Sequence, residues 1–215
     1  MGKSLNVMGR MMKARLALVV FLLLTGSQAA SAQKHEGAFL AGGLKTGEHG
    51  FVLPRPGIFR TGAGLTYQLN YSSRFFDGKA AALYFEFPLV VTPSRDLNAS
   101  NAVLPSSYSS LFFTPGIKLK LLPGLKWSPY AFAGVGVARL TSSDTQTDGQ
   151  PNSADRTKVR AAYDFGGGVD VKVFPHLSLR GEVRDFYSGT PSLNVTQLQN
   201  RQHNYMISAG LVVRF

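Results

Sequence analysis

Apolar and polar residues alternate with period two along most of the chain after residue 32. From Gly62 to Tyr71 the odd-numbered positions are alanine, leucine and tyrosine, and the even-numbered ones are glycine, threonine, glutamine and asparagine. Because successive side chains of a β-strand point to opposite faces, this alternation predicts a strand with one apolar and one polar face. The same reasoning predicts seven further strands, over residues 35–45, 80–92, 109–121, 130–140, 159–173, 177–187 and 205–215.

The connections between the predicted strands alternate between long and short. Three are short turns, at Asp77-Gly78, Pro123-Gly124 and Pro175-His176. The four others are long and polar: a stretch that contains Gly47, Pro54 and Pro56, then Pro93–Ser107, Thr141–Lys158 and Ser188–Asn204. Regular alternation of this kind predicts an all-β fold, an eight-stranded antiparallel up-and-down β-barrel with one elaborate end.

The chemistry of the two faces decides between a transmembrane β-barrel and a water-soluble one of the lipocalin type. The polar rows contain Gly62, Gly64, Gly166, Gly168 and Gly210, which suit a crowded lumen better than a solvated surface. For residues 130–140, which are apolar on both faces, we expect Gly134 and Gly136 inside and these residues toward lipid: Ala131, Ala133, Val135 and Val137. The sequence favours a barrel with lipid outside.

Aromatic residues lie toward the ends of the apolar rows. In the predicted topology Tyr163, Tyr187 and Tyr205 fall at the end with the long connections, and the opposite end has Tyr71, Trp127 and Phe215. Aromatic girdles that flank an apolar band are typical of outer-membrane barrels. These six residues are therefore the predicted girdle.

The first 32 residues have the organisation of a secretory signal peptide. A basic segment precedes the apolar run of residues 16–24, and the small residues Ala30-Ser31-Ala32 follow. We expect cleavage after Ala32, which leaves residues 33–215 as the barrel. The alternative, a membrane anchor, needs a longer apolar run of about 18 residues.

Charge and cysteine content exclude several other classes. Charged residues make up 16% of the chain, against roughly 25% in soluble domains. Removal of the four basic residues of the signal peptide leaves 19 basic and 12 acidic residues, a net charge of +7. These cations are scattered and form no basic patch with interleaved aromatics, so nucleic acid is not an expected partner. The chain has no cysteine, which excludes disulfides and a lipidated cysteine.

Charged residues of the polar rows predict a network of ion pairs inside the barrel. An eight-stranded barrel has room only for its own side chains, and unpaired buried charges are costly. The predicted members are Glu86, Lys118, Lys120, Asp164, Asp170, Lys172, Arg180, Glu182, Arg184 and Arg214. For the hairpin of residues 159–187 we predict the register that opposes Lys172 to Glu182 and Asp170 to Arg184, because it avoids like-charge pairs.

The last predicted strand carries Tyr205, Leu211, Val213 and Phe215 on one face and ends on an aromatic residue. In this it resembles the small eight-stranded outer-membrane barrels of Gram-negative bacteria, the OmpA/OmpX-like family. The resemblance covers residues 33–215. It implies a monomer in contact with outer-membrane lipid and lipopolysaccharide, and a terminal strand that the barrel-assembly machinery recognises.

Catalytic chemistry is not expected. His176, Ser178 and Glu182 share a strand face, but at about 3.3 Å per residue Glu182 lies roughly 20 Å from His176 and cannot orient it. Asp144, Asp148 and Asp155 match no calcium loop, and no residues have metal-ligand spacing, so no cofactor is predicted.

The sequence therefore predicts a non-enzymatic integral outer-membrane protein with four long extracellular loops. Its role is structural, or the loops bind an unidentified external partner. The alternatives are a narrow pore for small solutes and a lipid-A-modifying barrel enzyme.

Overall fold

The computed structural model describes residues 34–47, 49–53, 57–99, 104–152, 155–193, 196–197 and 200–215 of the 215-residue chain. The predicted signal peptide lies outside these ranges. No helix in the described part of the chain is long and apolar enough to cross a membrane. The strands of the described residues are β1 (His35–Thr46), β2 (His49–Leu53), β3 (Gly57–Thr61), β4 (Gly64–Asp77), β5 (Ala81–Ala99), β6 (Ser107–Phe113), β7 (Gly116–Leu121), β8 (Trp127–Ser142), β9 (Thr157–Phe174), β10 (Leu177–Gly189), β11 (Thr196–Gln197) and β12 (Arg201–Arg214).

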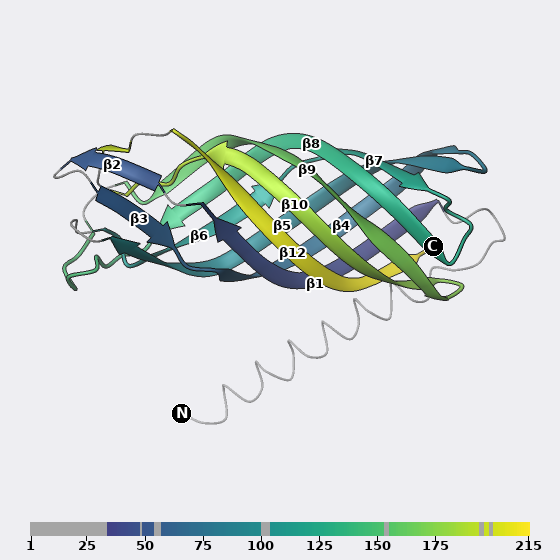
Figure 1. Cartoon of the computed structure of the whole chain (residues 1–215), viewed down its shortest axis with the longest axis horizontal. Coiled ribbons are helices and arrows are strands. Elements are labelled where there is room, and N and C mark those ends of the chain that lie inside the picture. The colour runs from purple at the N-terminus through teal and green to yellow at the C-terminus, as the bar shows by residue number, and fades with distance from the viewer. Residues whose placement is uncertain are drawn as a thin grey trace, which may run out of the picture. The chain divides into compact units, whose positions relative to one another are not determined.

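The long strands close into a ring of antiparallel neighbours (Figure 1). The order around the ring is β1, β4, β5, β6 with β7, β8, β9, β10 and β12, and β12 pairs with β1 to complete it. β6 and β7 together fill one position, because Pro115 has no backbone N–H for the ladder and interrupts it. The predicted eight-stranded up-and-down barrel is confirmed.

The two ends of the barrel differ. The turn end carries the three short connections, at residues 78–80, 122–126 and 175–176. At the other end, here called the loop end, the strands reach further than predicted. β5 continues to Ala99, through half of the predicted Pro93–Ser107 loop, and the first long connection is in fact the β2–β3 hairpin. Phe59 in β3 pairs with Ala99, so the hairpin prolongs the barrel sheet.

The prediction of long loops was wrong at these positions for a physical reason. Backbone groups pair equally well where the outer face of a strand meets water instead of lipid, and such a strand needs no apolar outer row. The hydrophobic pattern therefore ends where the lipid ends, although the strand does not.

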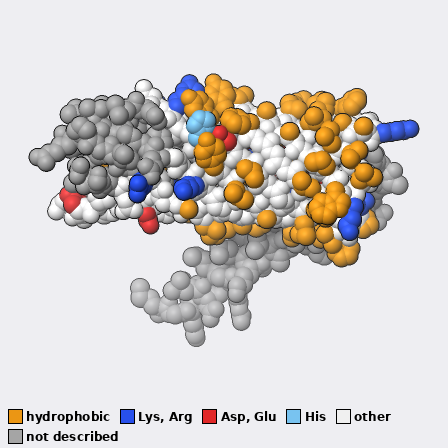
Figure 2. All heavy atoms as spheres, viewed as in Figure 1, with side chains coloured by type: hydrophobic (Ala, Val, Ile, Leu, Met, Phe, Trp, Pro, Cys, Tyr) orange, Lys and Arg blue, Asp and Glu red, His pale blue; other side chains and the backbone are white. Residues whose placement is uncertain are grey.

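The side chains of the ring follow the predicted alternation, with the apolar rows outside. On β4, Leu65 and Leu69 are more than half exposed, whereas Thr66, Gln68 and Asn70 are buried. β8 also has the predicted orientation, with Val135 and Val137 exposed and Gly134 and Gly136 on the inner row. On the face that Figure 2 shows, hydrophobic side chains form a broad band, and Lys and Arg side chains lie toward the two edges of that band. Polar residues inside and apolar ones outside define a transmembrane barrel.

Candidate functional site

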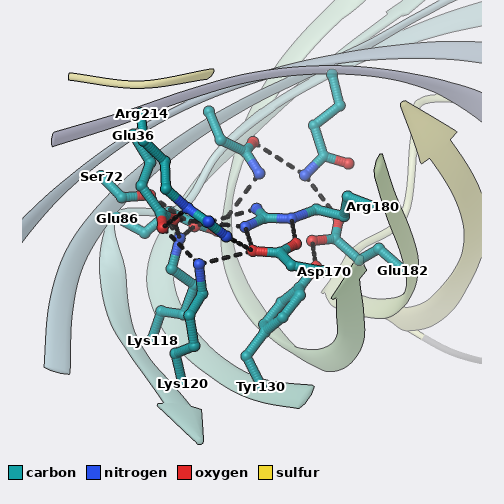
Figure 3. Close-up of polar contacts among 12 residues, drawn as sticks. Glu36, Ser72, Glu86, Lys118, Lys120, Tyr130, Asp170, Arg180, Glu182 and Arg214 are labelled. Atoms are coloured by element: carbon teal, nitrogen blue, oxygen red, sulfur yellow. Dashed lines mark hydrogen bonds and ion pairs between the residues drawn. The ribbon is translucent and has the colours of Figure 1, made fainter. Parts of the chain in front are cut away.

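The turn half of the lumen contains a closed set of charges, here called the lumen ion network. It has five cations and five anions from six strands: Lys118, Lys120, Arg180, Arg184 and Arg214, with Glu36, Glu86, Asp164, Asp170 and Glu182. All of these side chains except that of Arg214 are almost completely buried. Figure 3 shows most of them pointing toward one another across the interior. The network is electrically balanced, so its charges need no counterions from solvent.

Glu36 on β1 is a member that the sequence analysis missed. Its Oε2 accepts a hydrogen bond of 2.9 Å from Lys118 Nζ, and its other oxygen pairs with Lys120. Arg214 Nε lies 3.3 Å from Oε1. A signal was available, because Glu36 shares the inward parity of Leu40. Because β1 is rich in glycine, its apolar and polar residues alternate only weakly, and the inward position of Glu36 was not evident from the sequence.

Asp170 on β9 and Arg180 on β10 form the best-defined pair of the network. Arg180 donates from Nε to Oδ1 at 2.7 Å and from Nη2 to Oδ2 at 3.0 Å. This bidentate geometry is among the strongest that side chains offer. Lys120 Nζ adds a contact of 2.6 Å to Oδ2 and links the pair to Glu36.

Arg184 on β10 is the centre of the second half of the network. It donates to Asp164 Oδ2 at 2.9 Å and to Glu182 Oε1 at 2.8 Å, and it also pairs with Glu86. Its guanidinium carbon lies 4.2 Å from the centroid of the Phe132 ring. Three carboxylates from three strands thus share one cation, and Glu86 also pairs with Lys118 at 2.7 Å.

Two glycines of β9 make room for this cluster. A Cβ on Gly166 would come within 2.9 Å of Arg184 Cγ, and one on Gly168 within 2.7 Å of Tyr130 Oη. Tyr130 uses that space to donate a hydrogen bond of 2.5 Å to Glu182. These two glycines of the predicted polar row therefore serve close packing inside the lumen.

Neutral polar side chains make several further hydrogen bonds to the charged groups. Ser72 donates to Glu86 at 2.8 Å and accepts from Lys118 at 2.8 Å. Gln68 donates to Glu182 at 2.8 Å, and Thr114 donates to Asp164 at 2.9 Å. Burial of charges is tolerable only with such additional hydrogen bonds.

Two predictions about the charged residues were wrong. Lys172 is exposed and is not part of the interior set. The β9–β10 register opposes Asp170 to Arg180 and Lys172 to Ser178, and so Glu182 faces Gly168. The predicted register, with Asp170 opposite Arg184, is therefore wrong. An irregularity between Leu177 and Ser178 brings Arg180 level with Asp170, which pairs these charges directly and leaves Lys172 beside the turn.

Apolar side chains close the lumen on the loop side of the network. The first cluster contains two stacked rings, Phe112 and Phe186, whose centroids are 4.7 Å apart, together with Leu44, Val90, Ala138, Ala162 and Met206. Beyond it, Arg95 donates to Thr46 at 2.6 Å and lies 4.3 Å from the Tyr108 ring centroid. A second apolar cluster follows, formed by Leu97, Leu104, Tyr108, Leu140 and Leu193.

The outer surface has aromatic rings toward both ends. At the loop end, Tyr163, Tyr187 and Tyr205 line up with His203, which the sequence analysis did not identify. His203 Nδ1 lies 2.7 Å from Asp185 Oδ2. Nearer the turn end, the exposed rings include those of Tyr71 and Trp127.

The residues of the predicted assembly signal lie on and after β12. Tyr205 and Leu211 are exposed on its outer face, and Val213 is half-buried. β12 itself ends at Arg214, so Phe215 follows the last residue of the strand.

The histidine and the carboxylate that a catalytic site on β10 would need do not contact each other. Glu182 is engaged by Arg184, Gln68 and Tyr130, whereas His176 lies in the exposed turn with Nδ1 3.3 Å from the carbonyl oxygen of Arg214. No group of histidines and carboxylates among the described residues has the geometry of a metal site.

Comparison with known proteins identifies the fold. Neisserial surface protein A has a TM-score of 0.53 and 13% identity, with 86% of this chain and 98% of that chain covered. The outer membrane protein OprG from Pseudomonas aeruginosa has a TM-score of 0.51 and 13% identity, with 87% and 98% covered. No protein-family model and no curated protein matches the sequence. At these identities the likeness establishes the fold, that of the small eight-stranded outer-membrane β-barrels.

Proposed function

We propose that the protein is a non-enzymatic integral outer-membrane protein with a barrel that is closed to solutes. Its loop end acts as a rigid surface that stiffens the envelope or binds an external partner. The observation that carries this proposal is the filling of the lumen: a balanced ion network in the turn half, and fully buried apolar side chains above it.

The environment of the barrel is part of the proposal. The apolar outer band and the resemblance support an outer-membrane location in contact with lipopolysaccharide, with the loop end outside the cell. The resemblance also supports insertion of the chain by the barrel-assembly machinery through its last strand. The continuation of β5 and the β2–β3 hairpin beyond the apolar band supports a surface role, because it forms sheet structure where loops were expected.

The two alternatives have less support. A pore requires a continuous hydrated path, whereas Phe112, Phe186 and Met206 are fully buried across the bore. A lipid-modifying enzyme requires a nucleophile beside its general base. His203 pairs with Asp185 on the outer surface and could act as a base, but its outward neighbours on β12 are Arg201 and Tyr205, neither of which is a serine or threonine.

The test is single-channel recording of the purified, folded protein in planar bilayers. We expect at most small flickering events, because no ion path avoids both the charged and the apolar layers. Reproducible conductance in the nanosiemens range would refute the closed lumen and favour the pore. A deletion strain, compared with wild type for adhesion, serum sensitivity and detergent sensitivity, then tests the surface role.

A further inference from the structure

An open pocket of about 410 Å³ lies on the barrel wall at the loop end. Its lining is Arg160, Ala161, Gly189, Thr190, Asn200 and Arg201. These residues come from the loop-side ends of β9, β10 and β12 and from the segments that follow or precede them. Gly189 is directly opposite Arg201 in the β10–β12 ladder. The pocket is therefore a local feature of three adjacent strand ends.

The pocket lies just beyond the aromatic girdle on the outward side. Ala161 is two residues from Tyr163 on β9, and Gly189 is two residues from Tyr187 on β10, so each pair shares the outer face. Girdle aromatics mark the level of lipid headgroups. The pocket thus opens at the height where the charged groups of outer-leaflet lipids lie.

The lining is cationic and contains no carboxylate. It has two guanidinium groups, a threonine hydroxyl and an asparagine amide. None of the ion pairs formed within the described ranges includes Arg160 or Arg201. Two uncompensated arginines beside neutral donors have the chemistry of an anion site, because guanidinium groups bind phosphate through paired N–H donors.

Aromatic faces hold one of these arginines in place. The guanidinium carbon of Arg201 lies 5.3 Å from the ring centroid of Tyr187 and 5.8 Å from that of Tyr163. A cation–π contact places the guanidinium over the face of the ring and occupies none of its N–H donors. Arg201 is therefore positioned at the pocket with its donor groups still available to an anion.

A glycine positions the other arginine. A Cβ on Gly189 would lie 2.7 Å from Cγ of Arg160 and 3.0 Å from its Cβ and Cδ. The stem of Arg160 thus crosses β10 where that strand has no side chain. Gly189 is the residue that allows both guanidinium groups to line one pocket.

We propose that this pocket, here called the Arg160–Arg201 pocket, binds the phosphate group of an outer-leaflet lipid. The inference rests on the proposed outer-membrane location, because that location supplies the phosphate at the level of the girdle. Free phosphate has the same charge chemistry and is the alternative source that the experiment must separate.

The experiment is native mass spectrometry of the folded full-length mature chain in a neutral detergent. It is titrated in parallel with bisphosphorylated lipid A, dephosphorylated lipid A and inorganic phosphate. We expect binding of the bisphosphorylated lipid, weaker binding of the dephosphorylated lipid, and no binding of inorganic phosphate at the same concentration. Retained affinity for dephosphorylated lipid A would overturn the phosphate assignment, and tight binding of free phosphate would overturn the lipid assignment.

Two variants test the residues. The pair Arg160→Gln and Arg201→Gln should weaken lipid binding by about tenfold or more, because charge-assisted hydrogen bonds are lost. Gly189→Ala keeps both charges but displaces Arg160, and it should weaken binding as well. An unchanged affinity in Gly189→Ala would contradict the pocket geometry.

The matched control is Lys126→Gln with Lys172→Gln, which removes the same charge from exposed positions near the turn end. It should leave lipid affinity unchanged. An equal loss in the control pair would show diffuse attraction and would overturn the site. Heat-modifiable migration on gels confirms folding of each variant, and cell fractionation tests the outer-membrane location separately from the affinity.

Discussion

At the scale of single residues, Arg184 holds three carboxylates of the interior together. It pairs with Glu86, Asp164 and Glu182, and all four side chains are buried. A buried ion pair adds little compared with an apolar pair, but the loss of one partner leaves charge without compensation. The removal of Arg184 therefore affects stability more than its number of contacts suggests.

We expect Arg184→Met to lower the free energy of unfolding by about 3–5 kcal/mol, because three buried carboxylates lose their shared cation. The measurement is urea-induced unfolding of the barrel in lipid vesicles. Lys172→Met is the control: this lysine is exposed on the neighbouring strand, and its replacement should change stability by less than about 0.5 kcal/mol. Similar losses in both variants would contradict the placement of Lys172 outside the network.

At the scale of elements, β12 has two tasks. It closes the ring, since it pairs with β1 from Glu36–Arg214 to Thr46–Asn204 and with β10 on its other side. An open edge in hydrocarbon would leave backbone groups unpaired at a cost of several kcal/mol each. Recognition of the same strand by the assembly machinery is the second task that we propose for it.

Deletion of Phe215 separates these two tasks. We expect a loss of inserted protein in cells that exceeds the effect of one buried aromatic side chain, roughly 2 kcal/mol. The purified deletion variant should still refold in detergent, where no recognition step occurs. The amounts of heat-modifiable protein in both settings provide the measurement. Normal insertion of the deletion variant in cells would refute the role of Phe215 in the assembly signal. If the variant also fails to refold in detergent, Phe215 has a structural role instead.

At the scale of the whole molecule, the two ends of the barrel should face different compartments. The chain has no natural cysteine, so a single engineered one reports its own side of the membrane. Gln150 is exposed at the loop end, and Gly124 lies in a turn with open space around its Cβ position. Both positions tolerate a small polar side chain.

We expect a membrane-impermeant maleimide to label Gln150→Cys in intact cells and to leave Gly124→Cys unlabelled. Both should react after the outer membrane is permeabilised. This result follows from the proposed topology, with the loop end outside the cell. Labelling of Gly124→Cys alone would invert the orientation.

The sequence by itself determined the barrel, the number of its strands and which face of each strand meets lipid. These properties follow from local alternation: a strand between lipid and a polar lumen must change character at every residue. The outward orientation of Leu65 and Leu69 and the inward orientation of Thr66 and Gln68 can therefore be predicted without knowledge of the neighbouring strands. Most members of the lumen ion network followed from the same parity.

Only the tertiary structure decided how these rows meet. Glu36 reaches Lys118 across 82 positions of sequence, and the register that opposes Asp170 to Arg180 depends on an irregularity beside the turn. The exit of Lys172 from the interior follows from that register. Contacts between side chains that are distant in sequence depend on closure of the whole ring. Backbone pairing beyond the lipid leaves no alternating apolar pattern in the sequence. Local pattern therefore specified the faces of the strands, and ring closure specified the contacts between them.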